Sequence, residues 1–135
     1  MKNIRLGCAT LVTKGDKVLL GRSNKKHIYG QLVVPGGGVE YGECFCDTSR
    51  REILEETGIQ IQNIRQVGVY EIVKPDQDNH RVIIFCHADY KSGEIKASDD
   101  LIEAAFYTRA QIADEIKKGT ICEVPLKMLR DSGWA

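Results

Sequence analysis

The chain has 135 residues, of which 42% are hydrophobic and 28% charged, and its 19 basic residues are balanced by 19 acidic ones. This length fits one domain with its own core, which we expect to span residues 1–135. A net charge of zero argues against the broad basic surface that a long nucleic acid or an anionic membrane requires, but leaves room for a small phosphorylated ligand.

The sequence also argues against a membrane-spanning protein and against a protein held together by disulfides. No apolar run approaches the roughly 20 residues of a membrane span, and the N-terminal stretch MKNIRLGCATLV lacks the uninterrupted apolar core of a signal peptide. The five cysteines are odd in number and contain no C-x-x-C pair, which points to a reducing compartment. Cys44 and Cys46 are better explained as small buried residues than as zinc ligands. We therefore expect a cytoplasmic protein.

The first half of the chain alternates short extended segments with turns and then becomes helical. Pro35 and the glycines after it predict a loop, and Gly58 stands where a helix C-cap glycine belongs. The predicted elements are strands over 6–13, 17–23 and 31–34, followed by a helix over 44–57.

The second half is richer in β-branched residues. A long extended stretch carries a predicted bulge at Gly68, and Thr108 with Gln111 forms a capping box. The predicted elements are strands over 59–73, 81–90 and 103–108, and helices over 109–118 and 124–130. This order predicts an α/β (α+β) fold in which a mixed sheet is sandwiched between helices.

Three glutamates crowd one side of the first helix. At about 100° per residue, Glu52, Glu55 and Glu56 share an arc of about 100°. Like charges at these spacings destabilise a helix, and the negative end of the helix dipole adds to the penalty. The neighbouring arginines are expected on a different face. A solvated acidic face explains neither this placement nor the preceding PGGG, whereas a bound Mg²⁺ or Mn²⁺ explains both.

The same residues carry a family resemblance. The run Gly37-x5-Glu43-x7-Arg51-Glu52-Ile53-Leu54-Glu55-Glu56-Thr57-Gly58-Ile59 resembles the Nudix box, G-x5-E-x7-R-E-U-x-E-E-x-G-U, where U is a bulky aliphatic residue. Every defined position matches. The predicted order of strands and helices is also similar to the Nudix fold, so the resemblance spans nearly the whole chain. Two departures are Leu32, where many relatives have tryptophan, and Thr48, where many have alanine.

The resemblance implies roles for the matching residues. Gly36, through its carbonyl, and Glu52, Glu55 and Glu56 are implied as ligands of Mg²⁺. Arg51 belongs to the catalytic set and pairs with Glu43 to fix the loop to the helix, and Gly37 and Gly58 are structural. Glu52 is also implied as the base that takes a proton from the attacking water. Downstream acids are alternative bases, namely Asp99, Asp100 and Glu103, although a solvated turn is the better explanation of that segment.

The implied reaction is hydrolysis of a nucleoside diphosphate linked to a group X. We favour a MutT-like reaction that converts a (deoxy)nucleoside triphosphate to a monophosphate and pyrophosphate, because NHRVIIF and LKMLRDSGWA are similar to segments of MutT-like triphosphatases. An ADP-ribose or nucleotide-sugar pyrophosphatase is the alternative, and Pro75 is its hint. A non-catalytic nucleotide-binding regulatory module is an alternative of another class.

Candidate substrate contacts lie outside the box. Tyr29 is a candidate ring for stacking on the base, and Asp99 and Asp100 are further candidate substrate contacts. The basic loop at Lys25, Lys26 and His27 is better explained as solvated than as a phosphate contact. The expected partner is a small nucleotide rather than a long RNA or a membrane. A homodimer is also compatible with the sequence.

Overall fold

Seven strands form one mixed sheet in the computed structural model, which describes residues 2–135. The strand order is β3-β2-β1-β6-β5, with β4 paired to β1 and β7 paired to β2. Strands β1 and β6 run parallel, whereas the other pairs are antiparallel. The bounds are Arg5–Lys14 for β1, Lys17–Ser23 for β2, Leu32–Val33 for β3, Gly36–Gly38 for β4, Gln60–Lys74 for β5, Asn79–Ser92 for β6 and Leu101–Thr108 for β7.

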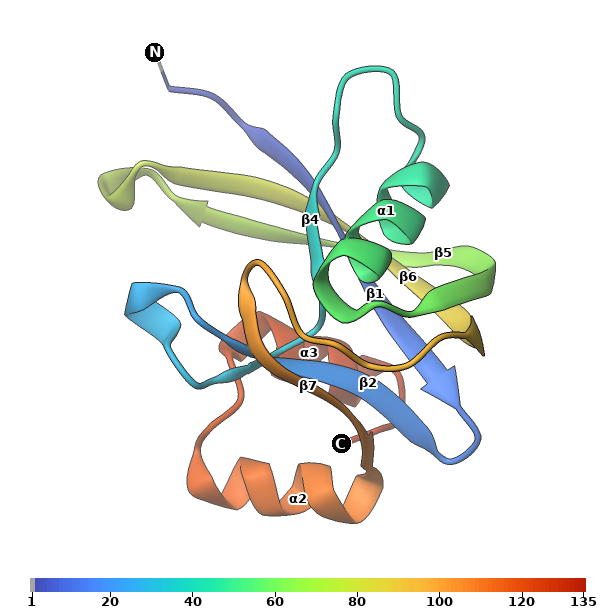
Figure 1. Ribbon diagram of the computed structural model, residues 1–135. Helices are drawn as coiled ribbons and strands as arrows, with labels where there is room; N and C mark the ends of the chain where they lie inside the picture. Colours follow the sequence, from blue (N-terminus) through green and yellow to red (C-terminus); the bar gives the residue numbers. More distant parts are fainter. Residues whose placement is uncertain (1) are drawn as a thin grey trace.

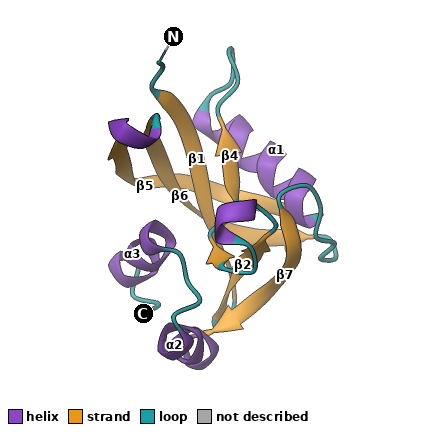
Figure 2. Ribbon diagram, turned by 90° about the vertical axis from the view of Figure 1, so that its left-hand side faces the viewer, coloured by secondary structure: helices purple, strands orange, loops and turns teal. Residues whose placement is uncertain are grey.

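Helices cover both faces of this sheet, as Figures 1 and 2 show. Helix α1 packs on one face, and α2 and α3 lie on the other. Their bounds are Phe45–Thr57 for α1, Arg109–Lys118 for α2 and Glu123–Asp131 for α3, and two 3-10 turns, η1 at Lys26–Ile28 and η2 at Pro75–Gln77, interrupt the connections. The predicted mixed sheet between helices is confirmed.

Two hydrophobic clusters fill the two layers. Successive strand residues point to opposite faces, so neighbours on β1 serve different clusters: Val12 packs with Ile53 of α1, whereas Leu11 packs with Ile112 of α2 and Leu129 of α3. All five of these side chains are fully buried. The sheet is therefore a common wall between the α1 layer and the α2–α3 layer.

The predicted helix ends are confirmed. Helix α1 ends at Gly58, whose φ of 75° is left-handed and whose amide donates to the carbonyl of Leu54 at 2.9 Å. Helix α2 begins with the Thr108–Gln111 capping box. The chain leaves α1 in a defined direction, so β5 starts at Gln60 against the same layer.

Two expectations about the strands are corrected. The glycines after Pro35 form a strand rather than a loop, because the first half of β1 has a free edge: Cys8 pairs with Gly37 and Ala9 with Gly36, while β2 pairs only with the end of β1 at Thr13 and Lys14. Strand β7 is also longer than predicted, because Leu101 pairs with Ser23 of β2 across a bulge and so extends the ladder.

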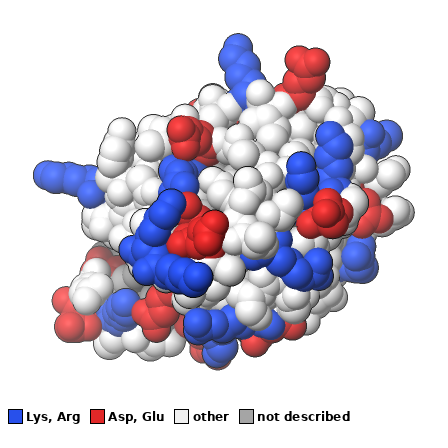
Figure 3. All heavy atoms as spheres, turned by 90° about the horizontal axis from the view of Figure 1, so that it is seen from below, with Lys and Arg blue, Asp and Glu red and all other residues white. Residues whose placement is uncertain are grey.

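Charge is dispersed on the face that carries α2. Figure 3 looks at this face from below the view of Figure 1, and basic and acidic side chains alternate across it without gathering into one basic patch. Within residues 2–135, no helix is long and apolar enough to cross a membrane.

Packing of α1 on the sheet rests on Ile53, which is 0% exposed. We expect Ile53→Ala to lower the free energy of unfolding by about 2–5 kcal/mol, because it removes buried methyl groups and leaves a cavity. The matched control is Leu54→Ala, next along the helix and 49% exposed, which should change stability by no more than about 0.5 kcal/mol. Urea unfolding of both variants measures the difference, and equal losses would contradict this packing.

Candidate active site

An ion pair fastens the loop before α1 to the helix. Arg51 donates from Nε and Nη2 to the two carboxylate oxygens of Glu43 at 2.8 and 2.9 Å, and Nη2 also donates to the carbonyl of Gly38 at 3.0 Å. The hydrogen bond from Arg51, followed by one from the Glu40 amide, lowers the pKa of Glu43 to about 2. The hydroxyl of Thr48 donates to Glu43 at 3.0 Å. The loop, β4 and α1 are therefore held as one unit.

The same arginine also reaches the glutamates of the helix. Arg51 Nη1 lies 2.7 Å from a carboxylate oxygen of Glu52 and 3.6 Å from one of Glu55. The expectation that the arginines lie on another face is therefore wrong for Arg51, because residues four apart, such as Arg51 and Glu55, share one helix face. Arg51 offsets part of the mutual repulsion of the glutamates.

Glu56 is the buried acid of the site. Its residue exposure is 3%, and its Oε1 has no hydrogen-bond partner among the described residues. Burial, the adjacent carboxyl of Glu52 and the charge of Asp100 together raise the pKa of Glu56 to about 8. An unpaired buried carboxylate is costly. We therefore expect Glu56 to bind either a proton or a cation.

The glycines of β4 allow the backbone to approach these acids. A Cβ atom on Gly37 would overlap the carboxylate of Glu52, and one on Gly36 would overlap the carbonyl oxygen of Cys8 in β1. A larger residue at Gly36 would push the β1 backbone away, whereas one at Gly37 would displace the carboxylate of Glu52. The β4 backbone thus lies directly against the acidic face of α1.

The structure brings together only part of the predicted acidic set. Glu52 and Glu56 are in contact, whereas the side chain of Glu55 is 48% exposed and turns to Arg51. Among residues 2–135, no three His, Cys, Asp or Glu side chains lie close enough together to hold a metal ion. The predicted ligand roles therefore stay predictions.

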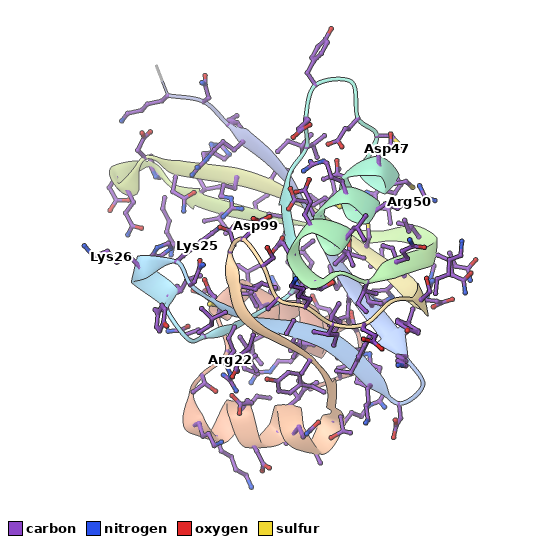
Figure 4. The ribbon with its side chains drawn as sticks, viewed as in Figure 1. Arg22, Lys25, Lys26, Asp47, Arg50 and Asp99 are labelled. Carbon is purple, nitrogen blue, oxygen red and sulfur yellow. The ribbon has the colours of Figure 1, made fainter. Side chains whose placement is uncertain are left out.

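A cavity of about 770 Å³ opens beside these acids. Glu56, Gly36 and Gly37 form part of its wall, and Asp100, a predicted substrate contact, also lines it. The other two predicted contacts, Asp99 and Tyr29, lie outside the set of described residues that form its wall. Figure 4 shows Asp99 at the tip of the loop before β7, close to η1, where its carbonyl accepts from the side-chain amide of Asn24 at 2.7 Å.

Several basic side chains in this cavity were not predicted as site residues. Lys25 and His27, expected to be solvated, belong to the wall. Arg5 and Arg81 form another part of it, from adjacent positions on β1 and β6. The available signal for Arg81 was a charge at the start of an otherwise apolar strand, RVIIFC, which costs free energy unless the charge has a partner.

The sequence is similar to a known domain family and to characterised proteins. Residues 1–127 match the NUDIX domain. The chain is 36% identical over 97 residues to the ADP-ribose pyrophosphatase of Methanocaldococcus jannaschii, covering 72% of this chain and 57% of that protein. It is 39% identical over 112 residues to the NAD-capped RNA hydrolase NudC of Pasteurella multocida, covering 82% of this chain and 40% of that protein.

Solved structures with a similar fold include Nudix hydrolases. A NUDIX hydrolase from Nitrosomonas europaea superposes with a TM-score of 0.83 at 20% identity, covering 97% of this chain and 89% of that one. The chain spans only 57% and 40% of the lengths of the two curated relatives. With a domain match over nearly its whole length, a matching fold and a complete box from Gly37 to Ile59, the chain belongs to the Nudix family.

Proposed function

We propose that this protein hydrolyses a phosphoanhydride bond in a nucleoside diphosphate linked to a group X, with Mg²⁺ or Mn²⁺ as cofactor. The observation that carries the proposal is Glu56: a buried carboxyl with an unpartnered oxygen, in contact with Glu52, in the wall of a large cavity. A structural acid in this position would be expected to have a hydrogen-bond partner.

The residues present fit a hard divalent cation. Carboxylate and carbonyl oxygens are the ligands that Mg²⁺ prefers, usually with water and substrate phosphate completing its shell. Glu52 and Glu56 would supply carboxylates and the β4 backbone at Gly36 would supply a carbonyl. Glu55 is ion-paired with Arg51 beside them and would be a further ligand. Such a cation neutralises the negative charge of the phosphate oxygens that repels an attacking water.

The side chains then perform positioning and proton transfer. A water oxygen forms a bond to one phosphorus atom, the bridging phosphorus–oxygen bond breaks, and the leaving phosphate keeps the electron pair. We assign Glu52 as the acceptor of the water proton, with Asp100 as the alternative acid in the cavity wall. Arg51 holds Glu52 in place through its 2.7 Å ion pair.

Two substrate classes share this chemistry. A nucleoside triphosphate is the class favoured from the sequence, whereas the curated relatives at 36–39% identity are named for ADP-ribose and NAD-capped RNA. A non-catalytic nucleotide-binding module is disfavoured, because Glu52, Glu55 and Glu56 are all retained. Hydrolysis of a panel of nucleoside triphosphates, ADP-ribose and nucleotide sugars, with Mg²⁺ and then with EDTA, tests the proposal, and binding without turnover would contradict it.

Removal of a proposed metal ligand should abolish turnover without unfolding the protein. We expect Glu56→Gln and Glu55→Gln each to lower kcat at least about a hundredfold, because each removes a charge that helps to hold the cation. The exposed Glu94→Gln, on the loop after β6, is the matched control and should keep full activity. Phosphate release and circular dichroism on the same samples measure both effects. A Glu56→Gln variant as active as the wild type would exclude the metal assignment.

The buried acid should make the metal-free protein less stable at higher pH. Because the folded-state pKa of Glu56 is about 8 against an ordinary value of 4.5, the folded state holds a proton that the unfolded state has lost between these pH values. Its contribution to stability is therefore present below about pH 4.5 and falls as pH rises toward 8, by an amount on the order of a few kcal/mol.

Thermal melts in EDTA at pH 5 and pH 8 measure this effect. Glu56→Gln should melt above the wild type at pH 8, and the difference should shrink at pH 5. Addition of Mn²⁺ at pH 8 should raise the melting temperature of the wild type but not that of the variant. If the wild-type and variant melting curves respond alike to pH and to Mn²⁺, Glu56 is not the acid that titrates or binds the cation.

A further inference from the structure

Arg81 is a half-buried cation without an acidic partner. Within residues 2–135 no carboxylate lies within 4.0 Å of its guanidinium, in contrast to Arg22 and Arg51, each of which is paired with glutamates. Burial and then the neighbouring Arg5 lower the pKa of Arg81. Two adjacent arginines with no anion between them are unfavourable unless a ligand supplies one.

The sheet places this pair on the cavity side. Arg81 stands opposite Arg5 on β1 and Ile72 on β5 in the strand register. It alternates in phase with Ile83 and Phe85, whose side chains belong to the cluster shared with α2 and α3. Arg5, Arg81 and Lys74 all line the cavity, and Arg5 is steadied by a 3.3 Å hydrogen bond from its Nη2 to the side-chain oxygen of Asn79.

A strip of backbone without side chains joins Arg81 to the proposed metal site. A Cβ atom on Gly7 would lie 3.4 Å from the carbonyl oxygen of Gly37 and 4.0 Å from Nη2 of Arg81. Gly37 in turn lies against the carboxylate of Glu52. Glu56 and Arg81 line the same cavity, and Gly7 and Gly37 line it between them without adding a side chain.

We propose that Arg81, with Arg5 beside it, binds a phosphoryl group of the substrate that lies beyond the diphosphate held at Glu52 and Glu56. This rests on the proposed function and names the substrate class: X is itself anionic, as in a nucleoside triphosphate. A guanidinium fork suits phosphate oxygens because it presents paired donors in one plane. ADP-ribose carries no phosphoryl group beyond its diphosphate, so it gains nothing from this pair. Arg81 is thus a specificity-determining residue rather than one that takes part in bond cleavage.

The decisive measurement compares Arg81→Gln on a nucleoside triphosphate and on ADP-ribose. We expect KM for the triphosphate to rise about ten- to a hundredfold, as for loss of one charged hydrogen bond, while kcat changes no more than about twofold. KM for ADP-ribose should stay within about twofold. Arg81→Lys should recover part of the loss, because it keeps the charge but not the fork.

Arg50→Gln is the matched control. Arg50 is exposed and lies on the side of α1 away from β4 (Figure 4), so its loss should leave both KM values unchanged. An equal rise in KM for both substrates, or no rise for either, would overturn the inference. So would a wild type that hydrolyses ADP-ribose but no triphosphate, although that result leaves the proposed hydrolysis intact.

A binding measurement separates failure of the inference from failure of the proposed function. If no substrate is hydrolysed with Mg²⁺, the proposed function fails, and calorimetric titration with inorganic tripolyphosphate still tests Arg81. Affinity weakened at least about tenfold by Arg81→Gln but not by Arg50→Gln supports the anion site. Equal affinity of the wild type and Arg81→Gln, or no binding by either, contradicts it.

Discussion

The burial of Glu56 is the constraint on which the site depends. Its carboxyl is covered by the α1–sheet interface, touches Glu52 and leaves one oxygen without a protein partner. Such a group raises the free energy of the folded protein, and contacts elsewhere in the fold must offset this cost. The fully buried Ile53 on the same helix and the Glu43–Arg51 clamp are the contacts that hold α1 against this cost. The cation that we propose for this site would remove the cost, and the stability regained in this way would contribute to its affinity.

The β4 backbone is held close to α1, beside the buried Glu56. Gly37 touches the carboxylate of Glu52, and Arg51 ties the carbonyl of Gly38 to Glu43 on the other side of the loop. The backbone of β4 is thus fixed both by pairing with β1 and by the helix. A substrate that binds here meets a preformed surface, which reduces the entropy lost on binding.

Sequence patterns predicted the parts of the molecule that are set by local rules. The ends of α1 and α2 followed from a C-cap glycine and a capping box, and the box motif identified Glu43 and Arg51 as partners. Patterns failed where partners come from distant segments. Strand β4 exists because β1 offers a free edge, which three glycines do not signal. The Arg51–Glu55 contact is a local exception, because residues four apart share a helix face and the spacing already allowed the pair. The location of Arg81 beside Gly7 required the parallel register of β1 and β6.

The names of relatives say little about the substrate of this chain, because the box and the rest of the cavity wall have different roles. The box from Gly37 to Ile59 contains the acids of α1, the Glu43–Arg51 ion pair and the glycine that lies against Glu52. We propose that these residues bind the anhydride bond. We propose that the group X binds elsewhere, at β1, β5 and β6, where Arg5, Lys74 and Arg81 line the cavity. Specificity between substrates that share a diphosphate comes from differential contacts with the part that differs. Relatives that share the box can thus share the reaction yet differ in X. In this chain, Arg81 has no carboxylate partner within residues 2–135, which is why we propose an X that carries negative charge.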